Sequence, residues 1–246
     1  MNEDACRVGV WCKGEWAVKA RNLAQEFNLA EATANDNEFD WLIRYEDDYL
    51  CLIECASPKF KPLIIDFDKP TGRITRDDPL RRAIGKGVRV VLDATAGLGS
   101  DTVLFLHMGF KVIAAERSAV IAVLLVDALR RCQNKKIREN LSLIHADAFD
   151  VLTKVNFNLP EIDVAYMDPM YPARGKSSAL AKKECRMLRG LVGDDHDASE
   201  LLACTRQYVK RVVVKRPPEA PPLADDHVTS FTGKLVRFDV YRGINR

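Results

Sequence analysis

The sequence predicts an α/β protein whose main part is a largely parallel β-sheet covered by helices. From residue 88 onward, short apolar runs alternate with longer segments of helical periodicity, which is the pattern of βαβ units. A turn with two glycines follows the first apolar run, and Asp168-Pro169 ends a later one. Such turns lie at the carboxyl edge of a parallel sheet, where open α/β proteins bind ligands.

The alternation predicts a seven-stranded sheet. We expect strands over residues 88–93, 111–116, 141–145, 162–167 and 211–215, followed by an antiparallel C-terminal hairpin of 228–231 and 234–241. Helices are expected over 101–108, 119–132, 148–155 and 199–208, the first of them capped by Ser100.

The first 75 residues follow another pattern and predict a small α+β domain. Apolar runs at 8–12, 39–45, 49–55 and 63–67 accompany one helical segment at 17–27. Segment 66–78 carries Pro70 and Gly72 among charged residues, which is typical of an exposed connection. We therefore divide the chain into an N-terminal domain, 1–75, and a main domain, 76–246.

Composition excludes several classes of protein. The 246 residues are 47% hydrophobic and 29% charged, as in ordinary globular proteins. No apolar stretch approaches the ~20 residues of a membrane-spanning helix, and the acidic N-terminus lacks the pattern of a signal peptide. Seven cysteines and four histidines show no metal or triad spacing, so we expect reduced thiols, no metal and a cytoplasmic location.

Two segments are locally basic although the net charge is only +2. Residues 57–89 hold nine Lys or Arg against four Asp or Glu, and residues 173–190 hold six against one. Both are basic enough to contact phosphate groups.

The glycine turn predicts a nucleotide cofactor. Gly97 and Gly99 lie between the first expected strand and the helix after it, so the backbone can pass close to a ligand below unpaired helix N–H groups. Glu116 ends the next strand, 23 residues after Asp93, where a carboxylate can hold a ribose diol.

The same residues favour S-adenosylmethionine over a dinucleotide. Thr102 replaces the third glycine of the dinucleotide fingerprint, so close packing beneath a pyrophosphate is not indicated. Asp93 and Asp147 suit a cofactor that carries both an ammonium group and an adenine amino group.

The segment after the fourth strand suits a planar amine. The carboxylate of Asp168 and the carbonyl oxygen of Pro169 can accept from an exocyclic amino group, while the ring of Tyr171 stacks on the base. We therefore assign Asp168, Pro169 and Tyr171 to catalysis.

These motifs carry a resemblance to a known family. The run 93–101, Glu116-Arg117, Asp147-Ala148 and Asp168-Pro-Met-Tyr171 resemble the motif series of Rossmann-like class I S-adenosylmethionine-dependent methyltransferases. With the segments 176–186, 191–193 and 211–217, they are similar to the RsmJ family of 16S ribosomal RNA guanine-N2 methyltransferases. The resemblance is dense from about 88 to 241 and loose over the first 75 residues.

The resemblance implies both a reaction and a set of contacts. The expected reaction is methyl transfer from S-adenosylmethionine to the N2 amine of a specific guanosine in small-subunit ribosomal RNA. The implied cofactor contacts are Ser100, Asp101, Glu116, Arg117, Asp147, Ala148 and Asp168. Two features depart from the family pattern: Ser100 stands where a basic residue is expected, and 66–79 is more acidic than the family's glycine-rich basic connection.

Basic residues near the acceptor motif are expected to bind RNA. The candidates are Arg174, Lys176, Lys182, Lys183 and Arg186, with Lys215 and Arg216 at the end of the fifth strand. The alternatives to RNA binding are that the first five lie on a solvated helix face and that the last two pair with nearby acids.

Other functions remain open from the sequence alone. Within amine methylation, another RNA or a protein glutamine is an alternative acceptor, and labelled cofactor would distinguish them. A nucleotide-binding oxidoreductase lacks its third glycine here, and a non-catalytic RNA-binding module would not need the acid and aromatic of 168–171. The expected partner is ribosomal RNA or the small ribosomal subunit, and the oligomeric state is left open.

Overall fold

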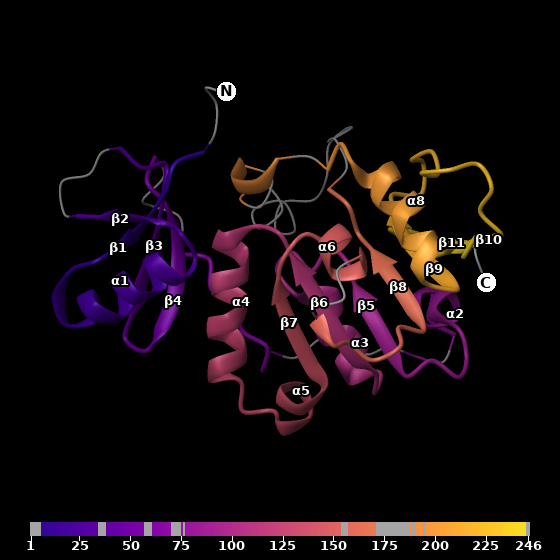
Figure 1. Ribbon diagram of the computed structural model, residues 1–246, viewed down its shortest axis with the longest axis horizontal. Helices are drawn as coiled ribbons and strands as arrows, with labels where there is room; N and C mark the ends of the chain where they lie inside the picture. Colours follow the sequence, from indigo (N-terminus) through magenta and orange to yellow (C-terminus); the bar gives the residue numbers. More distant parts are fainter. Residues whose placement is uncertain are drawn as a thin grey trace. The chain divides into compact units, whose positions relative to one another are not determined.

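The computed structural model describes residues 6–33, 38–56, 61–69, 75, 77–153, 157–170, 187, 190–193 and 195–244 (Figure 1). Its internal contacts divide the chain into two compact units. The first comprises Met1–Asp68, Ser118–Gln133 and Gly175–Gly193, and the second comprises Lys69–Arg117, Asn134–Arg174 and Asp194–Arg246. Within the described ranges, no helix has the length and apolar character needed to cross a membrane.

The first unit contains a four-stranded sheet in the order β2-β1-β3-β4. Its strands are β1 (Val8–Trp11), β2 (Ala30–Ala32), β3 (Trp41–Glu46) and β4 (Tyr49–Glu54). The strand β1 pairs in parallel with β2 and β3, and β3 and β4 form a hairpin. The short η1 (Gly14–Trp16) leads into α1 (Ala17–Glu26), which contacts β1. Of the expected run 63–67, only Leu63 pairs, as a single bridge to Leu52.

Helix α4 (Ala119–Arg131) lies with the first unit, although the sequence assigned it to the main domain. It contacts β4, and its buried Asp127 accepts a hydrogen bond from the Leu50 amide at 3.0 Å. Arg130 and Arg131 pair with the same carboxylate at 3.0 and 2.8 Å. The buried charge is thus compensated and ties the helix to the strand.

The second unit contains the predicted seven-stranded sheet, in the order β10-β11-β9-β8-β5-β6-β7. Its strands are β5 (Val90–Asp93), β6 (Lys111–Glu116), β7 (Leu141–His145), β8 (Val164–Met167), β9 (Arg211–Arg216), β10 (Thr229–Thr232) and β11 (Arg237–Arg242). The first five pair in parallel, and β11 and β10 add an antiparallel hairpin at one edge. The predicted fold class is confirmed.

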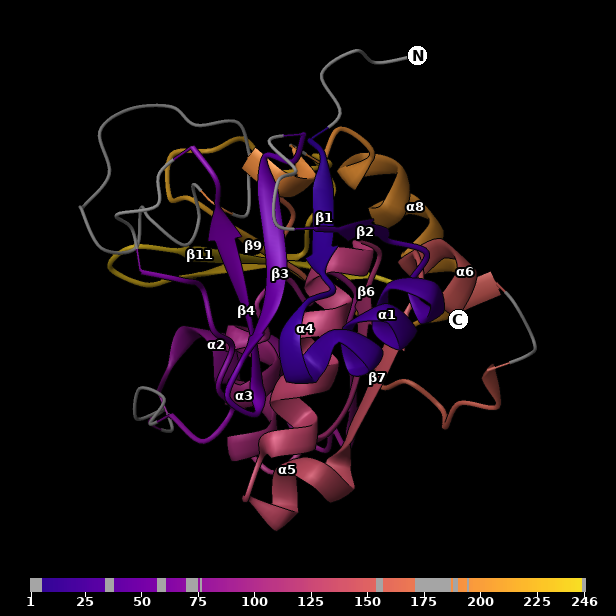
Figure 2. The same ribbon diagram turned by 90° about the vertical axis from the view of Figure 1, so that its left-hand side faces the viewer.

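Helices cover both faces of this sheet. They are α2 (Pro79–Ile84), α3 (Ser100–His107), α5 (Lys135–Asn140), α6 (Ala148–Thr153) and α8 (Ala198–Tyr208). The chain moves outward through β5, β6 and β7 and then returns to β8 and β9, so right-handed crossovers place α3 and α6 on opposite faces. Figure 2 shows α2 and α3 on one side of the sheet and α6 and α8 on the other.

Helix α3 begins one residue earlier than expected. Gly99 precedes it in the left-handed conformation, with φ of +76°, and Ser100 is its first residue and not its cap. A glycine adopts this conformation without the penalty that a Cβ would bring, and no side chain caps the first turn of the helix.

Candidate active site

Three acids meet at the carboxyl edge of the seven-stranded sheet because β6, β5 and β8 are adjacent and parallel. Asp93 ends β5, Glu116 ends β6, and Asp168 follows β8. The loop with Gly97 and Gly99 starts from the same edge. The structure therefore brings Asp93, Glu116, Asp168 and the glycine loop to the same edge of the sheet.

The glycine loop is held by Glu116. Gly97 and Gly99 have φ of +52° and +76°, which side chains with a Cβ rarely allow. The Gly97 amide donates to Oε2 of Glu116 at 2.8 Å, and Glu116 is 7% exposed. The carboxylate expected to bind a ribose thus also fixes the loop beside β6.

Asp93 is buried, which was not expected. Its Oδ2 accepts from the Thr102 hydroxyl at 2.5 Å and its Oδ1 from the Thr95 amide at 3.4 Å, which ties β5 to the loop and to α3. Burial raises the pKa of Asp93 to about 7. A direct contact with the cofactor stays a prediction, since only 1% of Asp93 is exposed.

Asp168 belongs to an ion-pair cluster centred on Lys215. The Nζ of Lys215 donates to Oδ2 of Asp168 at 2.9 Å and to Oδ2 of Asp101 at 2.8 Å, and the Tyr166 hydroxyl donates to Asp101. The Asp168 amide donates to the Thr95 hydroxyl at 2.7 Å. Among the described residues, Oδ1 of Asp168 accepts no hydrogen bond, and 40% of this side chain is exposed. One oxygen is thus fixed while the other can receive an amine.

The charges in this cluster depend on one another. The surrounding protein partly desolvates the Asp168 carboxylate and raises its pKa, and the neighbouring Lys215 counteracts that rise. Burial alone would lower the pKa of Lys215, but Asp168 and Asp101 raise it above its ordinary value. Burial and the Asp101 charge also raise the pKa of Tyr166, so its hydroxyl keeps its proton. At neutral pH, Lys215 is therefore a cation between two carboxyl groups.

Arg117 connects the cofactor edge to the acceptor motif. Its guanidinium pairs with Asp195, with Asp197 at 2.7 Å and with Asp147 at 3.9 Å. Asp195 in turn accepts from the Met170 amide through Oδ2 at 2.6 Å, and the Asp195 amide donates to the Met170 carbonyl at 3.2 Å. Two hydrogen bonds thus hold the backbone just after Pro169, and Arg117 holds the acid that makes them.

Comparisons with known proteins agree with this geometry. The model of a family described as putative SAM-dependent methyltransferases matches residues 22–243. Ribosomal RNA small subunit methyltransferase J of Coxiella burnetii is 39% identical over 91% of each chain, and that of a Shewanella species is 40% identical over 84% of each. The chain therefore belongs to the RsmJ family. It is an S-adenosylmethionine-dependent methyltransferase.

A solved structure supports the same fold for this RsmJ family member. The crystal structure of a SAM-dependent methyltransferase from Neisseria gonorrhoeae superposes with a TM-score of 0.73, at 27% identity and 97% coverage of both chains. The similarity includes the N-terminal part, for which the sequence indicated only a loose resemblance.

The acidic side chains at the sheet edge suit the hydrogen-bond donors of S-adenosylmethionine. Glu116 stands where ribose hydroxyls can donate to a carboxylate, and α3 starts with Ser100 exposed and Asp101 in its first turn. Asp147 follows β7 and accepts from the Phe149 amide at 2.9 Å, which orients it beside buried Ala148. The cofactor contacts that the family resemblance implies stay predictions.

The expected RNA-binding residues divide into two groups. Tyr171 and the basic residues Arg174, Lys176, Lys182, Lys183 and Arg186 lie outside the described residues. Lys215 pairs with two acids, as the alternative to RNA binding predicted. Arg216 is 3% exposed, and its guanidinium donates a hydrogen bond to the Pro221 carbonyl oxygen at 2.9 Å. Neither position favours contact with RNA, because both cations are already engaged.

Several residues of the site had not been singled out. Tyr166 precedes Asp168 by two residues, so the period of a strand places both on one face and could have revealed it. Asp195 and Asp197 are 78 and 80 residues from Arg117 in sequence, and no local pattern indicates their pairing.

Proposed function

We propose that this protein transfers the methyl group of S-adenosylmethionine to the exocyclic N2 amine of a specific guanosine in 16S ribosomal RNA. The arrangement of Asp168 carries the proposal, since one of its oxygens is fixed by Lys215 and the other is available to an amine. The names of the Coxiella and Shewanella relatives supply the substrate class. We place the reaction in the cytoplasm, with ribosomal RNA or the small subunit as partner.

The chemistry requires a better nucleophile than a free guanine amine, whose lone pair is delocalised into the ring. Donation of its two N–H groups to Asp168 Oδ1 and to the Pro169 carbonyl oxygen favours a pyramidal nitrogen. The cofactor supplies an electrophilic methyl group on a sulfonium. With the cofactor bound, the nitrogen lone pair would form the new N–C bond as the sulfonium S–C bond breaks and S-adenosylhomocysteine leaves, and the resulting ammonium would lose its proton to Asp168 or water. Positioning therefore matters more than general-base strength.

The target guanine must leave any helical stack to reach Asp168. Tyr171 is the predicted stacking partner, three residues beyond Asp168.

The substrate assignment predicts where a methyl label goes. Purified protein with methyl-labelled S-adenosylmethionine should modify small-subunit RNA taken from a strain that lacks this protein, and not transfer RNA or bulk protein. Mapping should locate one methylated guanosine, with the methyl group on N2. Label on a glutamine or only on another RNA would contradict the proposal.

A second prediction concerns Asp195, which positions the acceptor backbone. Asp195→Ala removes the acceptor of the Met170 amide, so kcat should fall by about tenfold or more with little change in cofactor affinity. Asp195→Asn keeps an oxygen acceptor for that amide and should retain more activity. Steady-state kinetics with RNA, beside calorimetric cofactor binding, would measure both. Equal losses of kcat in the two variants would show that the negative charge of Asp195, which pairs with Arg117, matters instead of the hydrogen bond to Met170.

A further inference from the structure

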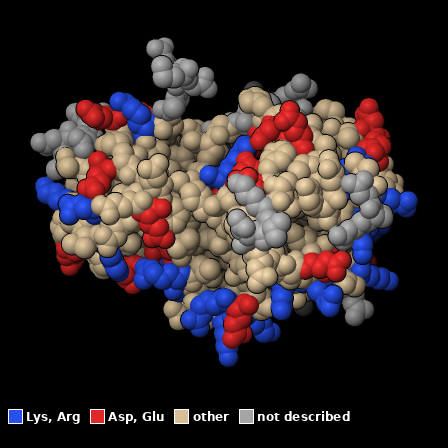
Figure 3. Space-filling model, viewed as in Figure 1, with Lys and Arg blue, Asp and Glu red and all other residues tan. Residues whose placement is uncertain are grey.

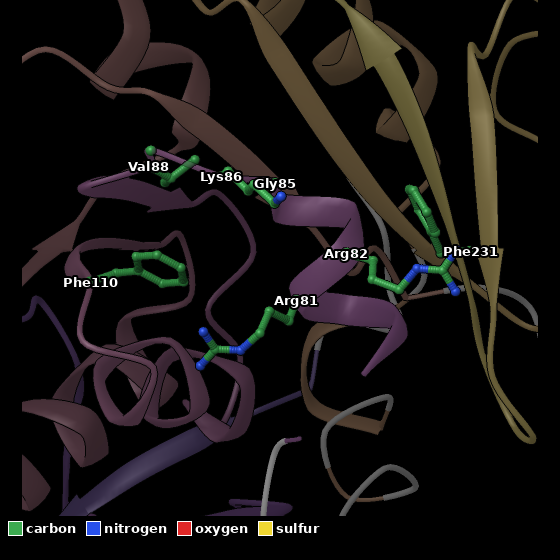
Figure 4. A pocket seen from close by; sticks show the side chains of 8 residues that line it. Arg81, Arg82, Gly85, Lys86, Val88, Phe110 and Phe231 are labelled. Atoms are coloured by element: carbon green, nitrogen blue, oxygen red, sulfur yellow. The ribbon is translucent and has the colours of Figure 1, made fainter. Parts of the chain in front are cut away.

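A pocket beside α2 takes no part in the site above. It has a volume of about 720 Å³, and its lining includes Arg81, Arg82, Lys86, Val88, Phe110 and Phe231 (Figure 4). Lys86 and Val88 precede β5, and Phe110 precedes β6, so this part lies toward the amino ends of strands whose carboxyl ends form the active site. The cations come from the basic segment 57–89, which the site does not use.

The pocket is positively charged. Among the described residues, no acid lines it, and Arg81, Arg82 and Lys86 form no ion pair. The Nε atom of Arg81 is buried, with no hydrogen-bond partner in the part of the chain that the structure describes. A buried donor without a partner is unfavourable, so an anionic acceptor bound here would relieve that penalty.

The pocket also offers flat surfaces. The Arg82 guanidinium lies over the Phe231 ring, 4.8 Å from its centroid, which holds both groups in place. Gly85 and Gly87 have φ of +96° and +75° and turn the chain sharply after α2 without adding side chains to the lining. Phosphate-binding cations beside planar groups are the features with which proteins hold unpaired nucleotides.

We propose that this pocket binds a stretch of the substrate RNA, with backbone phosphates on Arg81, Arg82 and Lys86 and a base stacked at Phe231. The proposal rests on the proposed function. The described lining residues include no Asn, Gln, Asp or Glu side chain, and the proposal assigns the three cations to phosphates, so we expect the contact to be independent of sequence. The pocket increases affinity for the RNA, while the guanosine is selected at Asp168.

The test compares two variants that lose the same charge. Arg82→Gln with Lys86→Gln removes two exposed pocket cations, and Lys136→Gln with Arg138→Gln removes two exposed cations of α5, a surface where basic and acidic side chains are mixed (Figure 3). For the pocket variant, KM for RNA should rise about tenfold. A plot of the logarithm of the RNA association constant against the logarithm of salt concentration should have a slope smaller in magnitude by about 1.5. Phe231→Leu should weaken RNA binding about tenfold with an unchanged slope. The α5 variant should keep the wild-type KM and slope.

The outcomes separate this proposal from the proposed function. If the wild-type protein methylates the RNA and the pocket variant shows the same KM and the same salt slope as the wild type, the pocket proposal is wrong and the proposed function stands. If no methyl transfer occurs at all, RNA binding by the same variants, measured without turnover, still tests the pocket. If guanosine monophosphate binds to the wild-type protein and the pocket variant loses that binding but still binds RNA normally, the pocket is a site for a free nucleotide and the proposal is wrong.

Discussion

Replacing Asp168 by asparagine should remove nearly all methyl transfer, while the cofactor still binds through its other expected contacts. We expect kcat on small-subunit RNA to fall by about 10²- to 10⁴-fold. Lys215 is a donor, so the introduced amide would turn its oxygen toward the Lys215 ammonium. Its NH₂ group would then face the substrate amine, donor against donor. The asparagine variant should thus be no more active than Asp168→Ala, although it is nearly isosteric.

The measurement needs cofactor binding and turnover on the same preparations. Calorimetric titration with S-adenosylmethionine and initial rates with labelled cofactor would supply them. Asp225→Asn is a matched control, because Asp225 is exposed and is not among the expected site residues. Substantial turnover by Asp168→Asn would contradict the role of this carboxylate as the acceptor of the amine hydrogens.

The sequence could predict the edge of the sheet because strand order and strand ends determine it. An apolar run followed by an acid places Asp93, Glu116 and Asp168 at carboxyl ends, and parallel pairing then brings those ends together. The glycine loop was equally predictable, since its function depends on local backbone freedom.

Contacts between distant segments could not be predicted in this way. Lys215 and Asp168 are 47 residues apart, and a lysine at a strand end is equally compatible with RNA contact or with pairing. Helix α4 is apolar on most of its surface, so its pattern predicts burial but does not indicate which sheet it contacts. The short α2 and α5, of six residues each, give too little periodicity to identify.

Lys215→Met should destabilise the protein because it leaves two acids facing each other. Removing one partner of a fully buried pair costs about 3–5 kcal/mol, but the 40% exposure of Asp168 screens its charge, so we expect about 2 kcal/mol. The pKa of Lys215 is raised in the folded protein, so its stabilising pairing is complete at neutral pH and is lost only as pH rises through that raised pKa.

The same substitution should change how the protein responds to pH. Lys215 opposes the desolvation that raises the pKa of Asp168, so its removal should raise that pKa further. An acid whose pKa is raised by folding loses stability as pH rises toward its folded pKa. Urea denaturation should therefore show a larger deficit for Lys215→Met at pH 8 than at pH 5. The low-pH limb of kcat/KM should move to higher pH, because only ionised Asp168 accepts the amine strongly.

Two further variants make the Lys215 prediction decisive. Lys210→Met removes the cation of an exposed pair with Glu161, 3.8 Å apart, and should change stability by less than about 1 kcal/mol with no shift in the pH profile. Asp101→Asn added to Lys215→Met removes the like charge beside Asp168 and should return the pH midpoint of kcat/KM toward that of the wild type. A double-mutant cycle of the four proteins measures this coupling. If the midpoint stays at the wild-type position in Lys215→Met, the lysine does not control the ionisation of Asp168, and its role in the site is confined to packing.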